Sequence, residues 1–142
     1  MKNNTDIIVD KIQKALLVKG GRVKASILLN KIIKEISVVE KQDPSRLLEE
    51  SLENIAPLFT IKTRKQGKKV VQTPIPIFSK SKRYAISSRW VVKNSKKHRS
   101  NSFIKNILAE INDSINNQGF SKKQQQELNK LVVLNRSSLM KN

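Results

Sequence analysis

The chain has 142 residues, with 29 Lys and Arg against 11 Asp and Glu, a formal net charge of +18 and no cysteine. A chain of this length forms one domain with its own core, and the lack of cysteine excludes disulfides and thiolate metal sites. No run approaches the eighteen apolar residues of a membrane span, so we expect no membrane partner. Self-repulsion at this net charge disfavours a compact state, which indicates a polyanionic partner.

The charges are unevenly distributed along the chain. Six of the 11 acidic residues fall between Glu35 and Glu53, whereas residues 54–109 contain no acid and 14 Lys and Arg. An A+T-biased genome would explain the abundance of Lys, Asn and Ile, but it would not explain the scarcity of acids. We interpret the acid-free segment as a surface that binds phosphate.

Apolar residues at helical spacing predict three helices in the N-terminal part, over about 5–18, 22–41 and 44–56. Gly20-Gly21 separates the first two helices. Asp43-Pro44 is typical of a helix start. Asp can cap the first turn, and Pro fits the first helical position because the backbone N–H there has no partner in the helix. The expected core positions are Ile8, Ile12, Ala15, Leu16, Ile27, Leu28, Ile32, Ile36, Val39, Leu48 and Leu52.

After residue 56 the helical spacing of apolar residues ends, and the pattern of residues 58–77 predicts a β-ribbon. Two β-rich runs flank Lys65 to Lys69, which contains a turn glycine. Pro74 and Pro76 cannot donate ladder hydrogen bonds, so the second strand is an edge and the sheet has two strands. An isolated ribbon of this kind is marginal in water. We therefore expect it to reach into a partner.

Three further helices are predicted over about 82–97, 102–117 and 121–134. In the first, Ile86, Trp90 and Val91 are expected to face inward. Ser121 to Gln124 fits a capping box at the start of the last helix. The other expected core residues of this part are Ile104, Ile107, Leu108, Ile111, Ile115, Leu128, Leu131 and Val132. The fold class is therefore mainly α: a single domain, 1–142, of six helices, with a two-stranded β-hairpin protruding between the third and fourth.

The sequence offers no catalytic constellation. His98 lies in a cationic run with no carboxylate for more than forty residues on its N-terminal side, so a histidine facing solvent or phosphate is expected. Glu49 and Glu53 share a helix face without an accompanying histidine, which favours a solvated surface over a metal site. We expect no enzyme activity, cofactor, metal or small-molecule substrate. Trp90 is interpreted as a core residue, whereas Tyr84 is open between packing and stacking on a base.

Several stretches, in order, carry a family resemblance. They are LENIAPL at 52–58, IKTRKQG at 61–67, QTPI at 72–75 and KRYAISSRWVV at 82–92, with Gly21-Arg22, Asp43-Pro44 and Asn135-Arg136 outside them. Together they resemble the ribosomal protein S7 family over nearly the whole chain. The chain departs from the family pattern at Lys68, where a second turn glycine is usual, at Val71, and at Ser87-Ser88.

The resemblance implies a structural protein of the small ribosomal subunit. Such a protein binds the 3′ major (head) domain of small-subunit ribosomal RNA, supports head assembly and contacts neighbouring ribosomal proteins of the head. Its ribbon would lie near the exit-site transfer RNA and the messenger path. The resemblance places Arg64, Lys65, Gly67, Lys68 and Lys69 at the ribbon tip, Lys82, Arg83 and Arg89 on the RNA-facing start of the fourth helix, and Lys2, Arg22 and Lys24 on the N-terminal side. Lys62, Lys80, Lys96, Lys97 and Arg99, cations of the acid-free segment, complete the predicted RNA-binding set.

Residues 1–18 contain two aspartates and no arginine, unlike a transit peptide. With the Lys, Asn and Ile bias, this favours an organelle-encoded protein of the mitochondrial ribosome in the matrix, with a plastid or bacterial cytoplasm as alternatives. The alternative function is an architectural DNA-binding protein whose basic ribbon enters a minor groove.

Overall fold

The computed structural model describes residues 4–17, 21–39 and 41–136, and its elements follow the predicted order. The helices are α1 (Asn4–Leu16), α2 (Arg22–Lys34) with its π-helical extension η2 (Glu35–Val39), α3 (Pro44–Ile55), α4 (Lys80–Ser95), α5 (Phe103–Ile115) and α6 (Phe120–Leu134). The antiparallel strands β1 (Phe59–Gln66) and β2 (Lys69–Pro76) form the only sheet of the described residues. The mainly α fold with a hairpin between the third and fourth helices is confirmed.

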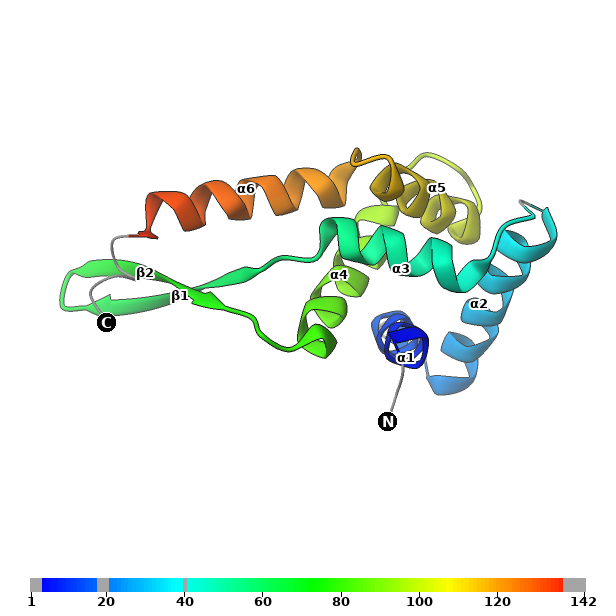
Figure 1. Cartoon of the computed structure of the whole chain (residues 1–142), viewed down its shortest axis with the longest axis horizontal. Helices are drawn as coiled ribbons and strands as arrows, with labels where there is room; N and C mark the ends of the chain where they lie inside the picture. Colours follow the sequence, from blue (N-terminus) through cyan, green and yellow to red (C-terminus); the bar gives the residue numbers. More distant parts are fainter. Residues whose placement is uncertain (1–3, 18–20, 40, 137–142) are drawn as a thin grey trace.

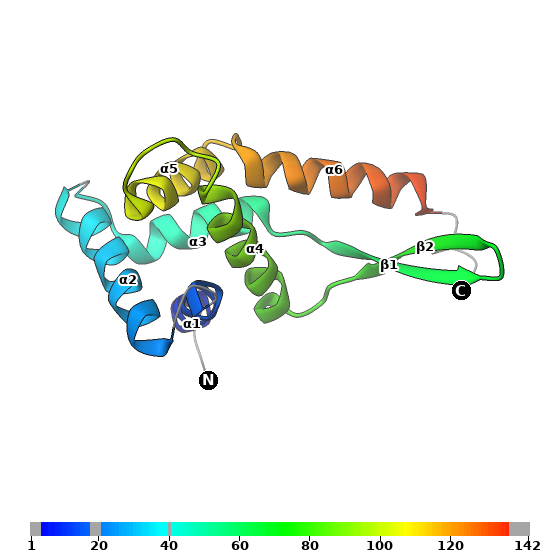
Figure 2. The same ribbon diagram turned by 180° about the vertical axis from the view of Figure 1, so that it is seen from behind.

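The molecule is elongated, with a helical body at one end and the ribbon at the other (Figures 1 and 2). α1 packs on α4 and α2, and α3 packs on α5. α6 leaves the body and runs beside the ribbon (Figure 1). Within the described part of the chain, no helix is both long enough and apolar enough to cross a membrane.

The helix starts follow local chemistry. The Asp43 side chain accepts a hydrogen bond from the Ser45 backbone N–H at 3.2 Å, and Pro44 occupies the first helical position, as predicted. Ser79 caps α4 and Ser102 caps α5 in the same way, through the amides of Lys82 and Lys105. These side chains pair amides that a helix start would otherwise leave unsatisfied.

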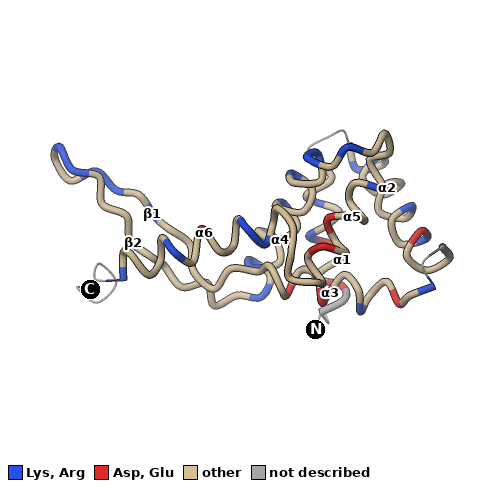
Figure 3. Tube along the Cα trace, turned by 90° about the horizontal axis from the view of Figure 1, so that it is seen from above, with Lys and Arg blue, Asp and Glu red and all other residues tan. Residues whose placement is uncertain are grey.

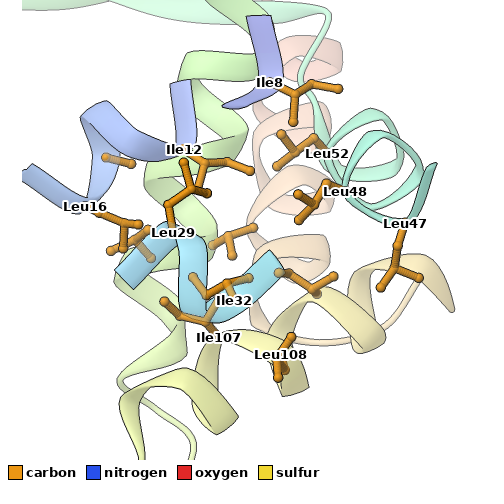
Figure 4. Packing of buried hydrophobic residues seen from close by; sticks show 14 of the residues in the cluster. Ile8, Ile12, Leu16, Leu29, Ile32, Leu47, Leu48, Leu52, Ile107 and Leu108 are labelled. Atoms are coloured by element: carbon orange, nitrogen blue, oxygen red, sulfur yellow. The ribbon is translucent and has the colours of Figure 1, made fainter. Parts of the chain in front are cut away.

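One apolar cluster unites α1 to α5 (Figure 4). The predicted core positions of α1 and α3 are buried, as are Ile32 and Ile36. Ile27 was wrongly placed in the core, because the buried face of α2 is formed by Ala25, Leu29 and Ile32, and Ile27 lies outside it. The side chain of Val39 lies outside the described residues.

The predicted inward faces of α4 and α6 were wrong in part. Ile86 and Trp90 are only half-buried, whereas Val91 is buried as predicted, together with Tyr84 and Val92 of the same helix. α6 adds nothing to the cluster among the described residues. Leu131, near the end of α6, is exposed, although α6 contacts β1 and also α3, α4 and α5.

Two isoleucines of α2 provide a matched test of this core. Ile32 is 1% exposed and Ile27 is 47% exposed. We expect Ile32→Ala to lower the free energy of unfolding by about 2–4 kcal/mol, because it removes buried methyl groups and leaves a cavity. Ile27→Ala should cost less than about 1 kcal/mol, as surface changes do. Denaturant unfolding followed by circular dichroism measures both. Equal losses would contradict the observed orientation of α2.

Candidate nucleic-acid interface

The two faces of the ribbon differ in what covers them. Successive side chains of a strand point to opposite sides. One side carries Phe59 and Ile61, which are half-buried, and Pro74, which is fully buried. α6 contacts β1 on this side, and the Asn135 amide donates a hydrogen bond to Gln72 Oε1 at 3.5 Å. The helix therefore covers one face of the ribbon and leaves the other free.

The free face of the ribbon is cationic. Lys62 and Arg64 lie on it in β1, and the antiparallel register places Lys69 of β2 on the same side. All three are exposed, and none of them forms an ion pair within the described residues. A groove of about 230 Å³ runs along the ribbon beside Lys62 and Arg64, and its other lining residues are Thr73, Pro74, Ile75 and Pro76. The face therefore presents unpaired positive charge to the solvent.

The ribbon ends in a two-residue turn, Gly67-Lys68. Gly67 has φ +63°, whereas Lys68 does not have a positive φ. This is the pattern of a type II′ turn, in which only the first central residue needs the left-handed region that glycine tolerates. Lys68 can therefore occupy the position where the family usually has a second glycine. Lys65 and Lys68 add exposed charge at the tip.

The remaining predicted cations, with one exception, lie on the outer surface of the helices and their connections. Those that are exposed are Arg22, Lys24, Lys80, Lys82, Arg89, Lys96, Lys97 and Arg99, whereas Lys2 lies outside the described residues. The prediction omitted Lys31, Lys34, Lys93, Lys105, Lys123 and Lys130, which are equally exposed. Figure 3 shows Lys and Arg on the ribbon, on α6 and across the body. The charge alone could have identified these six.

Arg83 is the exception, because it forms a joint between α4 and the end of α3. Its side chain is 13% exposed and donates to the Pro57 carbonyl at 3.2 Å and to Glu53 Oε1 at 3.3 Å. Tyr84 Oη donates to Glu53 Oε2 at 2.7 Å. Tyr84 is therefore a packed residue. Arg83 donates these hydrogen bonds to groups of the protein itself, although the resemblance places it on the RNA-facing side.

Burial and the contact with Glu53 both change how Tyr84 titrates. Burial of the phenol, followed by its hydrogen bond to Glu53, raises the pKa of Tyr84 to about 12. A group whose pKa is higher in the folded state stabilises the fold below its unfolded value of 10.0. That contribution is lost as the pH rises through the folded value.

We therefore expect Tyr84→Phe to lower the free energy of unfolding by about 1 kcal/mol at neutral pH, through loss of the hydrogen bond. The difference from the wild type should shrink between pH 10 and about 12, because there the phenol ionises in the unfolded wild-type chain but not yet in the folded protein, whereas the Phe variant has no phenol proton. Denaturant unfolding at a series of pH values measures it. A difference that stays constant up to pH 12 would contradict the assignment.

His98 does have a carboxylate partner, so its predicted solvent- or phosphate-facing role was wrong. Its Nε2 lies 2.7 Å from Oε2 of Glu110, which is fully buried. The sequence argument considered only the N-terminal side of the histidine, whereas Glu110 lies twelve residues after it. A lone carboxylate between the buried Ile107 and Ile111 of α5 was a signal that the sequence offered.

Glu110 also fixes the start of α6. Its Oε1 accepts a hydrogen bond from the Ser121 backbone N–H at 2.8 Å. The predicted capping box at Ser121 was wrong: α6 begins at Phe120, and the Ser121 hydroxyl accepts from Asn94 Nδ2 at 3.1 Å. A carboxylate from a neighbouring helix therefore replaces the local cap, and its negative charge suits a helix N-terminus.

The described residues contain one group that could in principle hold a metal ion. Ligand atoms of His98, Glu110 and Asp113 lie within 4.8 Å of one another. Both oxygens of Glu110 already accept hydrogen bonds, from the histidine and from the Ser121 amide. The arrangement therefore acts as a helix cap that joins α5, the connection between α4 and α5, and the start of α6.

We expect His98→Ala to lower the free energy of unfolding by about 2–4 kcal/mol, because it leaves a buried carboxylate with one unpaired oxygen. Arg99→Ala, on the exposed neighbour, should cost less than about 0.5 kcal/mol. Urea unfolding compares the two variants. Similar small losses in both would show that the pair does not stabilise the fold.

A helical body with a projecting basic ribbon, one face of which is free, is the architecture of a protein that binds a polyanion. The family model described as Ribosomal protein S7p/S5e matches residues 1–136. The chain therefore belongs to the S7p/S5e family of ribosomal proteins, which are structural components of the ribosome and not enzymes.

Curated relatives agree with the family assignment. The chain is 30% identical over 134 residues to the small ribosomal subunit protein uS7c of Bigelowiella natans, covering 92% of this chain and 80% of the relative. It is 25% identical over 132 residues to uS7 of Paramagnetospirillum magneticum (strain ATCC 700264 / AMB-1), covering 93% and 84%. The uS7A/uS7B protein of Bartonella bacilliformis (strain ATCC 35685 / KC583 / Herrer 020/F12,63) is 27% identical with the same coverage.

Proposed function

We propose that this protein is a structural constituent of the small ribosomal subunit that binds the 3′ major (head) domain of small-subunit ribosomal RNA. The observation that carries the proposal is the free face of the ribbon, where Lys62, Arg64 and Lys69 have no acidic partner within the described residues. Family membership makes ribosomal RNA the natural polyanion for this face.

The mechanism is recognition of shape and charge. An A-form RNA helix hides its base edges in a deep major groove, so proteins read its phosphates, 2′-hydroxyls and junctions. A rigid helical body with cations at fixed positions suits that task. Arg64 can form paired hydrogen bonds to a phosphate, whereas Lys62 and Lys69 provide mobile point charges. Binding would neutralise the repulsion among the 29 basic residues and support assembly of the subunit head.

The finer placement follows the family resemblance. The ribbon tip, with Lys65, Gly67 and Lys68, would lie near the exit-site transfer RNA and the messenger path. The body would contact neighbouring ribosomal proteins of the head. The projection of the ribbon away from the body supports this placement, because it lets the tip reach a site that the body does not occupy (Figure 1).

We also propose that the protein belongs to a mitochondrial ribosome and is encoded in the organelle. The abundance of Lys, Asn and Ile supports this compartment. The relatives named above are bacterial and, by the name uS7c, plastid-type. Mapping the coding gene to an organelle or a bacterial chromosome decides between the compartments.

The RNA interface is tested by binding to a transcript of the head domain of the small-subunit RNA over a series of salt concentrations. We expect affinity to fall steeply with salt, because each neutralised phosphate releases counterions. Lys62→Ala, Arg64→Ala and Lys69→Ala should each reduce the slope of log affinity against log salt by about one.

Arg46→Ala is the matched control, because it removes the same charge from an exposed residue that already pairs with Glu50 at 3.4 Å. Its salt slope should equal that of the wild type. Binding that does not depend on salt would contradict the proposal. Preference for duplex DNA over the transcript would favour an architectural DNA-binding protein instead.

A further inference from the structure

Phe78, in the connection between β2 and α4, is the most exposed of the large apolar side chains that the structure describes. It is 90% exposed, whereas every other described aromatic side chain is buried or half-buried. An aromatic ring offers a large apolar surface that folding normally removes from water. The exposure of Phe78 leaves its ring accessible to a partner.

The backbone on both sides of Phe78 is fixed. The Ile77 N–H donates to the Leu58 carbonyl at 2.8 Å, which extends the ribbon pairing by one residue beyond the strands. The Ser79 hydroxyl accepts from the Lys82 N–H at 3.4 Å and caps α4, and the Ser79 carbonyl accepts from the Arg83 N–H at 3.1 Å. Phe78 therefore lies in a segment whose backbone is held by hydrogen bonds on both sides, which lowers the entropic cost of binding a partner.

The surroundings of Phe78 are cationic. Lys80 and Lys82, two and four residues later, are exposed, and the first turn of α4 contains no acid. Glu53, the acidic residue that precedes the acid-free segment, is already engaged by Arg83 and Tyr84. A neighbouring protein that covered only an apolar ring would not need this charge, whereas a nucleic acid supplies both a flat ring and a phosphate.

We propose that Phe78 is a stacking platform for an unpaired base of RNA, with Lys80 and Lys82 neutralising the adjoining phosphates. The inference rests on the proposed RNA-binding function and adds a ligand of defined chemistry, a single-stranded or flipped-out nucleotide. Aromatic side chains that stack on splayed bases are a general means of binding unpaired RNA, and every base has a face to offer. Phe78 lies outside the RNA-binding set that the sequence predicted.

Two RNA probes of equal length, a short oligoadenylate and a duplex, test the platform with the full chain. Phe78→Leu keeps an apolar side chain but removes the aromatic face. We expect it to weaken oligoadenylate binding about tenfold, to leave duplex binding unchanged and to leave the salt slope unchanged. Lys80→Ala should lower the salt slope for both probes by about one. Phe78→Trp should retain the affinity and show quenching by oligoadenylate beyond that of Trp90.

Phe78 makes few contacts inside the protein, so these variants should unfold at the wild-type temperature, which thermal unfolding checks. Oligoadenylate binding by Phe78→Leu as tight as that of the wild type would overturn the platform, as would equal losses for both probes. Failure of the wild type to bind either RNA would overturn the proposed function and the platform with it. Unchanged RNA binding by both Phe78→Leu and Lys80→Ala would overturn the stacked base and its phosphate contact together.

Discussion

The functional geometry depends on the position of α6, and a buried carboxylate helps to hold it there, together with hydrogen bonds of Asn94, Lys122 and Gln125. Glu110 accepts the Ser121 backbone N–H and contacts His98, so it joins the start of α6 to α5 and to the connection between α4 and α5. From this joint, α6 runs beside the ribbon and covers the side of Phe59, Ile61 and Pro74. A two-stranded ribbon is marginal alone. The helix thus supports the ribbon and also determines which of its faces remains free to bind.

The free face of the ribbon places part of the net charge of +18 at fixed positions on one surface. Lysines and arginines on a flexible chain attract any polyanion, but their attraction is diffuse. Here Lys62, Arg64 and Lys69 share one side of a supported ribbon. Their spacing is set by the strand pleat, and the cost of ordering them is met during folding. In the proposed interface, Phe78 would add a chemically different contact at the other end of the ribbon, beside the first turn of α4.

The joint between α3 and α4 shows why charge alone does not identify an interface. Arg83 stands in the middle of the acid-free segment, next to Lys82. Lys82 faces solvent, whereas Arg83 turns inward to Glu53 and the Pro57 carbonyl. The two side chains differ in their surroundings because α4 begins beside the end of α3, where Glu53 and the Pro57 carbonyl accept hydrogen bonds from Arg83. A long-range contact of this kind has no signal in local sequence.

The amino-acid sequence by itself determined the elements, their order, the basic character and the family, because helical period, turn glycines, prolines and caps act over a few residues. Asp43-Pro44 and Gly67 are such local signals. Only the tertiary structure decided which side of each element is buried. It turned Ile27 and Leu131 outward, paired His98 with Glu110 and left Phe78 in water. These outcomes depend on which elements pack together, and packing joins residues that are distant in sequence.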